Sequence, residues 1–262
     1  MYKVLTIAGS DCSGGAGIQA DIKTITAHGM YAMSAITSLT AQNTTGVYGV
    51  MDSTPEILGK QLDCIFNDIF PDAVKIGMVS DKELINIIAE KLKEYKPKNI
   101  VLDTVMVATS GSPLLKPDSV NALIEELIPL ATVITPNITE AEVLGNCKIE
   151  CEKDLKDTAI ALYEKYGCNV LVKGGHLNDT ATDILCCNGE ITEFKGERID
   201  NNNTHGTGCT LSSAIACNLA KGLDLPDAIR NSKEYLVGAL KYNLNIGKGN
   251  GPLNHCYKIM ED

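Results

Sequence analysis

The chain has 262 residues, of which 44% are hydrophobic and 21% are charged, so it can bury the core of an ordinary folded protein. Its formal net charge of −10 argues against a protein that binds the phosphate backbone of nucleic acids. No apolar run reaches membrane-spanning length, and the start MYKVLTIAG lacks the layout of a signal peptide. We therefore expect a cytoplasmic protein whose ten cysteines, which form no C-x-x-C pair, are reduced.

Short apolar runs alternate with amphipathic stretches through the first two thirds of the chain. Apolar residues that recur at steps of three and four predict helices, for example at 81–95 and 117–127. This alternation is typical of an α/β fold with a parallel sheet between two layers of helices. The strand candidates are residues 4–8, 32–39, 73–76, 100–102, 133–135 and 170–172.

The last third of the chain has a different rhythm. Two apolar runs, 183–187 and 191–194, flank Asn188-Gly189, which is a strong hairpin signal and predicts a small antiparallel edge. Two long helices are predicted at 207–221 and 226–244, followed by the glycine-rich GKGNGPLNH. Since no linker or internal repeat interrupts the chain, we expect one domain spanning residues 1–262.

Polar residues and glycines follow six of the predicted parallel strands. Because ligands in such sheets bind beyond the carboxyl ends of the strands, these residues are candidates for a common site. In chain order they are Ser10-Asp11, Gln42, Gly77-Met78, Asp103, Asn137 with Glu140, and Lys173-Gly174-Gly175.

The stretch NTHGTGCTLSSAIA at 203–216 opens a helix with two glycines and a cysteine. Neither the P-loop pattern nor the dinucleotide fingerprint is present in the chain. Glycines at a helix start let several backbone N–H groups aim at one anion, where the helix dipole also favours negative charge. An ordinary N-cap by Thr207 or Thr210 is the alternative, and it would be preferred if these glycines stood alone.

Seven segments together resemble the hydroxymethylpyrimidine/phosphomethylpyrimidine kinases, which are members of the ribokinase-like superfamily. The resemblance covers nearly the whole chain, and its one noted departure is Cys12, where that family usually has proline. The segments are AGSDCSGGAGIQADIKT (8–24), SLTAQNTTGV (38–47), KIGM (75–78), VLDTVMVATSG (101–111), ITPNITEAEVL (134–144), VKGGH (172–176) and NTHGTGCTLSSAIA (203–216).

This resemblance implies a three-layer α/β/α sandwich that uses ATP and Mg²⁺ and forms a homodimer. It implies transfer of the γ-phosphoryl group of ATP to 4-amino-5-hydroxymethyl-2-methylpyrimidine, and then of a second phosphoryl group to the monophosphate. The alternatives are a pyridoxal/pyridoxine kinase of the same superfamily and a non-catalytic pyrimidine sensor. A dinucleotide oxidoreductase is a further alternative, but its fingerprint is lacking.

The substrate pocket implied by the resemblance centres on Gln42, whose amide offers both a donor and an acceptor to an aminopyrimidine. Asp21 is expected to contact the substrate, although a carboxylate early in a helix also simply favours the dipole. The pocket walls are expected to be apolar or to allow close approach, although such residues are commonly plain core; they are Gly9, Ala16, Met78 and Val105.

The phosphate end of the implied site is more highly charged. Asp103 and Glu140 are the carboxylates expected near Mg²⁺. Lys173, at the end of an apolar strand, needs an anionic partner, and an ATP phosphate would suit it better than solvent. Asn137 is expected to help bind ATP, with helix capping as the alternative. Asp11 is expected near the transferred phosphoryl group.

The implied catalytic group comprises Gly206, Thr207, Gly208 and Cys209, whose backbone amides would hold the transferred group. The Cys209 thiol has three candidate roles: an inert filler, a covalent nucleophile or a general base. We favour the base, because a helix N-terminus lowers the pKa of a thiol, although bound phosphates oppose that shift.

Overall fold

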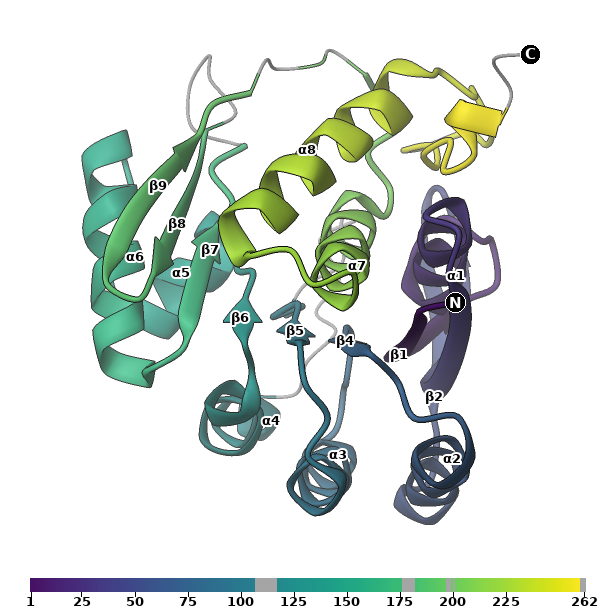
Figure 1. The fold of residues 1–262 in the computed structure, drawn as a ribbon. Helices are drawn as coiled ribbons and strands as arrows, with labels where there is room; N and C mark the ends of the chain where they lie inside the picture. The colour runs from purple at the N-terminus through teal and green to yellow at the C-terminus, as the bar shows by residue number, and fades with distance from the viewer. Residues whose placement is uncertain (107–116, 176–181, 197–198, 200, 260–262) are drawn as a thin grey trace.

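The computed structural model describes residues 1–106, 117–175, 182–196, 199 and 201–259 (Figure 1). The described strands form one sheet in the order β3-β2-β1-β4-β5-β6-β7-β8-β9. Their bounds are β1 Lys3–Asp11, β2 Tyr31–Asn43, β3 Gly46–Asp52, β4 Ala73–Ile76, β5 Ile100–Leu102, β6 Val133–Ile134, β7 Asn169–Val172, β8 Asp183–Cys187 and β9 Glu190–Phe194.

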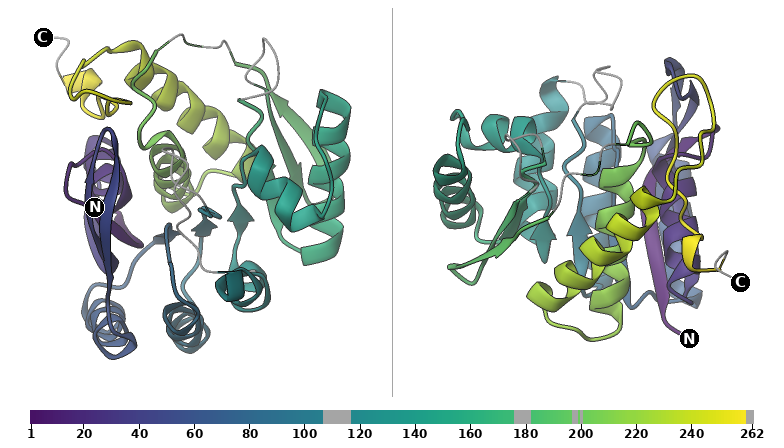
Figure 2. Two further views of the ribbon diagram at one scale, coloured as in Figure 1. Left: turned by 180° about the vertical axis from the view of Figure 1, so that it is seen from behind. Right: turned by 90° about the horizontal axis from the view of Figure 1, so that it is seen from above.

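Helices cover both faces of the sheet. One layer contains α1, α7 and α8, and the other contains α2 to α6 (Figures 1 and 2). The helices are α1 Gly17–Ala27, α2 Pro55–Asp68, α3 Lys82–Tyr95, α4 Pro117–Ala122, α5 Ile138–Gly145, α6 Glu152–Tyr166, α7 Thr207–Ala220 and α8 Leu225–Lys241, with short turns at η1 Leu123–Leu127, η2 Ile128–Leu130 and η3 Tyr257–Ile259. The predicted three-layer α/β fold is confirmed.

Alternate residues of the strands enter the two helical layers, as the period of two of a strand requires. Leu5 and Leu102 pack against the layer of α2 to α6, whereas Val4 and Val101 pack against α1, α7 and α8. Since both faces are covered, the parallel strands are mainly apolar and do not alternate regularly with polar residues; Thr6 and Lys75 are buried exceptions.

The middle strands are parallel and in register at their carboxyl ends. Ile7 pairs with Ile76, Ile76 with Leu102, and Leu102 with Ile134. The ladder continues one residue further, because Asp103 N donates to Ile76 O over 2.9 Å. The side chains that follow these strands therefore meet at one edge of the sheet, as predicted.

Both borders of the sheet are antiparallel. The β8–β9 hairpin was predicted, and Asn188 and Gly189 both have positive φ, 51° and 83°, as its tight turn requires. The β2–β3 hairpin was not predicted, because Gly46 and Gly49 weaken the strand pattern of β3. β2 also runs to Asn43, four residues beyond its predicted end.

The predicted helices are present with shifted ends. The helix expected at 117–127 is α4, whose last turn widens into the π-helical η1. α7 ends at Ala220, and α8 ends at Lys241, three residues before its predicted end. Side-chain caps set several starts, as at α3, where Asp81 accepts from Glu83 N.

The C-terminal segment of the described chain lies beside the N-terminal strands β1 and β2 (Figure 2). Residues 248 and 249 contact the turn that follows β2. The amides of Lys248 and Gly249 both donate to the Thr44 hydroxyl over 3.1 Å. Pro252 bridges to His205, just before α7. The predicted glycine-rich loop therefore joins the end of β2 to the start of α7.

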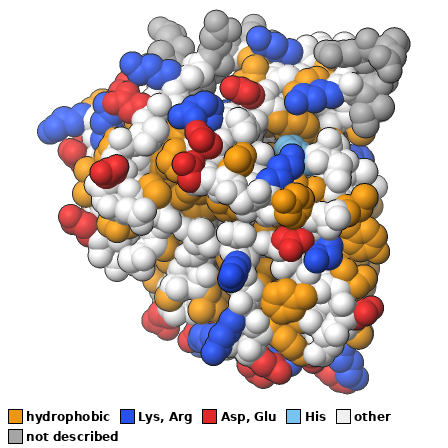
Figure 3. Space-filling view, viewed as in Figure 1, with side chains coloured by type: hydrophobic (Ala, Val, Ile, Leu, Met, Phe, Trp, Pro, Cys, Tyr) orange, Lys and Arg blue, Asp and Glu red, His pale blue; other side chains and the backbone are white. Residues whose placement is uncertain are grey.

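The ten cysteines are free thiols, as expected. None of the helices in the described ranges combines the length and the apolar character that a membrane crossing needs. Acidic and basic side chains lie interspersed on the face shown in Figure 3.

Candidate active site

The loop between β1 and α1 is folded around one carboxylate, that of Asp11. Its oxygens accept from Ser13 N at 2.9 Å, Gly15 N at 3.1 Å and Ala16 N at 2.9 Å. His205 Nε2 lies 2.8 Å from Asp11 Oδ2. Burial favours the neutral acid, but the hydrogen bonds from His205, Ser13 and Ala16 lower the pKa of Asp11 to about 2. Asp11 is thus ionised, and its described contacts hold the loop together.

The start of α7 presses against this loop. Gly206 has a φ of 85°, and a Cβ there would lie 2.0 Å from Gly15 O. A Cβ on Gly15 would in turn lie 2.3 Å from the His205 ring. Both glycines are therefore required for the two loops, far apart in sequence, to pack together.

The first turn of α7 has the features of an anion-binding helix start. No side chain caps it, and it contains no acidic residue. A Cβ on Gly208 would lie 3.4 Å from Asp103 Oδ2 and 3.5 Å from Lys173 Nζ. The amides that open the helix are thus beside a buried lysine and a carboxylate, where the dipole favours an anion.

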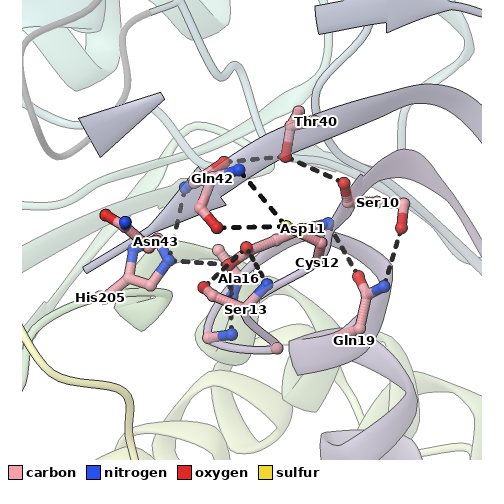
Figure 4. A network of polar contacts seen from close by, with 12 residues as sticks. Ser10, Asp11, Cys12, Ser13, Ala16, Gln19, Thr40, Gln42, Asn43 and His205 are labelled. Atoms are coloured by element: carbon pink, nitrogen blue, oxygen red, sulfur yellow. Dashed lines mark hydrogen bonds and ion pairs between the residues drawn. The ribbon is translucent and has the colours of Figure 1, made fainter. Parts of the chain in front are cut away.

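Gln42 lies at the end of β2, opposite the Asp11 loop (Figure 4). Its amide is contacted on both sides: Nε2 is 3.4 Å from His205 Nε2, and Oε1 is 3.1 Å from Thr40 Oγ1. Its backbone also bonds Cys12 Sγ, at 3.2 Å through its carbonyl. The residue that departs from the family's proline therefore ties the first loop to β2.

The buried carboxylate of Asp103 and the partly exposed Lys173 form an ion pair at the carboxyl ends of β5 and β7. Lys173 Nζ donates to Asp103 Oδ1 over 3.0 Å, and Thr135 Oγ1 donates to the same oxygen over 3.2 Å. Although burial opposes ionisation, Lys173 and Lys75 hold the pKa of Asp103 below its ordinary value. Ser212 of α7 approaches the other oxygen at 3.4 Å.

Glu140 is the second carboxylate of this cluster. Its side chain accepts from Asn137 N at 2.9 Å and from Thr104 Oγ1 at 3.2 Å, while its own amide donates to Asn137 Oδ1 at 2.9 Å. This is a capping box at the start of α5, so Asn137 has the capping role weighed against ATP binding. Burial and the charge of Asp103, opposed by Lys173, raise the pKa of Glu140.

The donors present suit a hard cation only in part. Within the ranges that the structure describes, no group of three or more His, Cys, Asp or Glu side chains could hold a metal ion. Asp103 and Glu140 are nevertheless two oxygen donors beside the anion-binding helix start. Mg²⁺ commonly binds through one or two carboxylates, with substrate phosphates and water completing its shell, so the pair fits that mode.

Asp21 lies in the interior and not on a pocket wall. It is fully buried, accepts from Lys75 Nζ at 2.8 and 2.9 Å, and also accepts from the hydroxyls of Thr6 and Ser213. No part of the carboxylate is exposed, and its described partners are interior groups, so the expected contact of Asp21 with the substrate stays a prediction. Asp21 neutralises a lysine under the site.

Cys209 is half-buried in the first turn of α7. Burial raises the pKa of its thiol to about 11, and the lowering effect of Lys75 does not offset it. The expectation of a lowered pKa is therefore wrong. Loss of hydration destabilises the thiolate by more than the nearby positive charge of Lys75 stabilises it. Ser213, one turn later on the same face of α7, bonds Asp21 over 2.8 Å.

The expected wall residues are only partly brought together. A Cβ on Gly9 would lie 3.5 Å from Met78 Sδ and 2.7 Å from Ser38 Oγ, so Gly9 and Met78 are neighbours. Ala16 is half-buried and precedes α1. Val105 follows Asp103 by two residues and is half-buried. Residues 107–111 and His176, also part of the recognised segments, lie outside the described residues.

Two site residues were not singled out from the sequence. Lys75 stands in the buried strand AVKI, and a lysine there signals a buried acidic partner. His205 lies in the glycine segment 203–216, but no sequence pattern indicates that it would meet Asp11 and Gln42.

Comparison with known proteins identifies the family of the chain. A family model described as "Phosphomethylpyrimidine kinase" matches residues 11–254. The chain is 48% identical to a hydroxymethylpyrimidine/phosphomethylpyrimidine kinase of Rhizobium meliloti, with 98% of each chain covered. It is 43% identical to the kinase of the same name from Escherichia coli, with 97% of each covered.

Solved structures give the same picture. A phosphomethylpyrimidine kinase from Clostridium difficile 630 superposes with a TM-score of 0.82 at 48% identity, covering 90% of this chain and 98% of that one. A pyridoxal kinase from Bacillus subtilis, in complex with ADP, superposes with a TM-score of 0.91 at 37% identity, covering 99% of both. The expected ribokinase-like fold is thereby confirmed.

Proposed function

The chain belongs to the phosphomethylpyrimidine kinase family, and on this premise we propose that it phosphorylates 4-amino-5-hydroxymethyl-2-methylpyrimidine with ATP, first to the monophosphate and then to the diphosphate. The observation that carries the proposal is that one short segment, residues 205–209, contacts both the residue expected to bind the acceptor and the residues expected to bind phosphate. At one end His205 contacts Gln42, and at the other Gly208 adjoins Asp103 and Lys173. An acceptor held by Gln42 and a phosphate held by Lys173 would thus share one helix start.

On this proposal the acceptor would be held by its edge. The Gln42 amide would donate to a ring nitrogen and accept from the exocyclic amine, while Gly9 and Met78 would border the ring. The hydroxymethyl group would then face the amides of Gly206, Thr207, Gly208 and Cys209. Positioning of this kind is most of what a phosphoryl transfer requires from a protein.

The donor nucleotide would bind where the positive groups lie. The Lys173 ammonium would contact the phosphates, and the α7 amides would stabilise charge on the migrating group. Mg²⁺, when bound at Asp103 and Glu140, would neutralise phosphate charge. Asn137, at the capping box of α5, and Asp11, in its loop, would help to bind ATP at this end.

Cys209 would accept the proton of the hydroxyl in the first step. Since burial raises the pKa of its thiol to about 11, the thiolate would be scarce at neutral pH, so this role needs the bound acceptor or the nearby Lys75 to favour deprotonation. The monophosphate is already largely anionic at neutral pH. The second step would therefore need no base.

A second candidate acceptor is pyridoxal. Pyridoxal kinases of known structure match the fold with a TM-score of 0.91 at 32–37% identity. The higher identity to the pyrimidine kinases and the double-sided amide of Gln42 favour the pyrimidine.

Mass spectrometry of the products separates these candidates. The purified protein would be incubated with MgATP and the pyrimidine alcohol, and in a parallel reaction with pyridoxal; an EDTA-treated sample tests the need for a divalent ion. Pyrimidine monophosphate followed by diphosphate is the expected result. Pyridoxal phosphate without any phosphorylated pyrimidine would overturn the proposal in favour of the second candidate.

A further inference from the structure

His205 is the point at which three separate segments of the site meet. Its ring packs on Gly15, its Nε2 lies 2.8 Å from Asp11 Oδ2, and the same nitrogen lies 3.4 Å from the amide of Gln42 (Figure 4). Its backbone amide donates to Gly251 O over 3.1 Å. The residue is buried, so solvent does not compete for these contacts.

The contact with Asp11 determines where His205 carries a hydrogen. The Asp11 carboxylate already accepts three backbone amides and the Ser13 hydroxyl, as an ionised group does. An ionised carboxylate has no hydrogen to donate, so at 2.8 Å the hydrogen must lie on His205 Nε2. This holds for the neutral ring and for the doubly protonated ring.

The hydrogen on His205 Nε2 restricts the Gln42 amide. If Gln42 Nε2 faced it, two N–H donors would oppose each other across 3.4 Å. On the other side, Thr40 Oγ1 lies 3.0 Å from Ser10 O and 3.1 Å from Gln42 Oε1, and its single hydrogen serves only one of these acceptors. Turning the amide by 180° relieves both contacts: its oxygen becomes the second, weaker acceptor of the His205 Nε2 hydrogen, whose main acceptor at 2.8 Å is Asp11. Its nitrogen then donates to Thr40, and Thr40 donates to Ser10 O.

We propose that His205 is a specificity-determining residue that fixes the orientation of the Gln42 amide, with oxygen toward His205 and nitrogen toward Thr40. One N–H and one oxygen lone pair then remain for a ligand, in a fixed order. That order matches a heterocycle whose edge presents an acceptor nitrogen beside an amine donor. The inference rests on the proposed function for the identity of that heterocycle.

The test uses a ligand whose edge carries the opposite order. Replacing the 4-amino group of the pyrimidine alcohol by a 4-oxo group turns the ring nitrogen into an N–H donor and the exocyclic group into an acceptor. Dissociation constants of both ligands, measured by calorimetry without ATP, give a preference ratio. Wild-type protein is expected to bind the amino compound more tightly by about fivefold to tenfold or more.

Two matched variants isolate the N–H group. His205→Phe keeps a ring against Gly15 but removes the donor, so the Gln42 amide becomes free to turn and the preference ratio should fall toward one. His205→Gln restores a terminal N–H and should keep the preference. A role in packing alone would change both dissociation constants together and leave their ratio intact.

The outcomes are separable. A folded His205→Phe protein that keeps the wild-type ratio overturns the inference while leaving the proposed function standing. If that variant does not fold, His205→Leu, a smaller side chain that also lacks the donor, decides instead: an unchanged ratio overturns the inference and a reduced ratio supports it. Wild-type protein that binds neither pyrimidine refutes the proposed function, and the inference with it.

Discussion

Two lysines of the central sheet, Lys75 within β4 and Lys173 just after β7, are both held by an aspartate, yet their surroundings differ. Lys75 and Asp21 have no exposed surface, their charges cancel, and the Thr6 and Ser213 hydroxyls complete the cluster. The Lys173 side chain is 17% exposed and faces two carboxylates, Asp103 and Glu140, beside the open start of α7.

The difference separates charges that stabilise a fold from charges that are available to a ligand. The Lys75–Asp21 pair is neutral and enclosed, so an added ion would not stabilise it. The cluster of Lys173, Asp103 and Glu140 has an excess of negative charge and is partly exposed, so it can bind a cation together with a phosphate. The four predictions that follow test this contrast, from the largest expected effect to the smallest.

Lys173→Met should lower kcat/KM for the pyrimidine alcohol by about a thousandfold, because the variant lacks the cation expected to stabilise phosphate charge. Steady-state kinetics with MgATP measures this. Lys156→Met, which removes two ion pairs on the surface, is the matched control and should retain nearly full activity. A Lys173→Met enzyme that retains a tenth of the activity would contradict the role of Lys173 in stabilising phosphate charge.

Lys75→Met should act on folding and destabilise the protein by about 3–5 kcal/mol, since it leaves Asp21 charged and unpaired in the core. Urea unfolding monitored by circular dichroism measures this. The double variant Asp21→Asn/Lys75→Met should be less destabilised than the single one. Lys60→Met, which breaks an exposed pair, is the control. Equal unfolding free energies for Lys75→Met and Lys60→Met would contradict the buried-pair role.

Cys209→Ala should impair the first phosphorylation about a hundredfold more than the second, because only the hydroxyl acceptor needs a base. Burial raises the pKa of this thiol to about 11, so a thiolate-dependent first step in the wild-type enzyme should accelerate about tenfold per pH unit between pH 7 and 9. Single-turnover assays of each step measure both effects. Equal losses in the two steps, or the same pH slope in the variant, would leave Cys209 as a packing residue.

Asp11→Asn should cost about 2 kcal/mol of unfolding free energy near neutral pH, corresponding to a pKa of about 2 in the folded protein against an ordinary 3.8. Because the folded pKa is lowered, this stabilisation is complete above about pH 4 and is lost as the pH falls toward 2. Urea titrations at pH 4.5 and 2.5 should show a smaller acid loss for the variant. Asp227→Asn, at an exposed position, is the control; an identical acid loss in wild type and Asp11→Asn would refute the assignment.

Much of the parallel core could be predicted from the sequence. Each strand there is an apolar run bounded by polar residues or glycine, so the polar strand ends identified Asp103, Glu140 and Lys173 as neighbours before any coordinates were known. β3 could not be predicted in this way, because its glycines and exposed side chains carry no burial pattern.

The roles of single residues were harder to predict, because they depend on partners remote in sequence. A carboxylate early in a helix, as at Asp21, can favour the helix dipole or bind a ligand. Only the fold shows that Lys75, 54 residues away in sequence, donates to both oxygens of Asp21. The thiol of Cys209 sits where the helix dipole lowers a pKa, but its depth in the fold, which the sequence does not reveal, works in the opposite direction and is the larger effect.

The bond between Asp11 and His205 joins residues 194 positions apart. During synthesis the first loop therefore leaves the ribosome long before its partner exists, and the pocket beside Gln42 stays unfinished until the last third of the chain has emerged. A nascent kinase should bind its acceptor only at the very end of translation, which delays catalysis until the whole protein can fold.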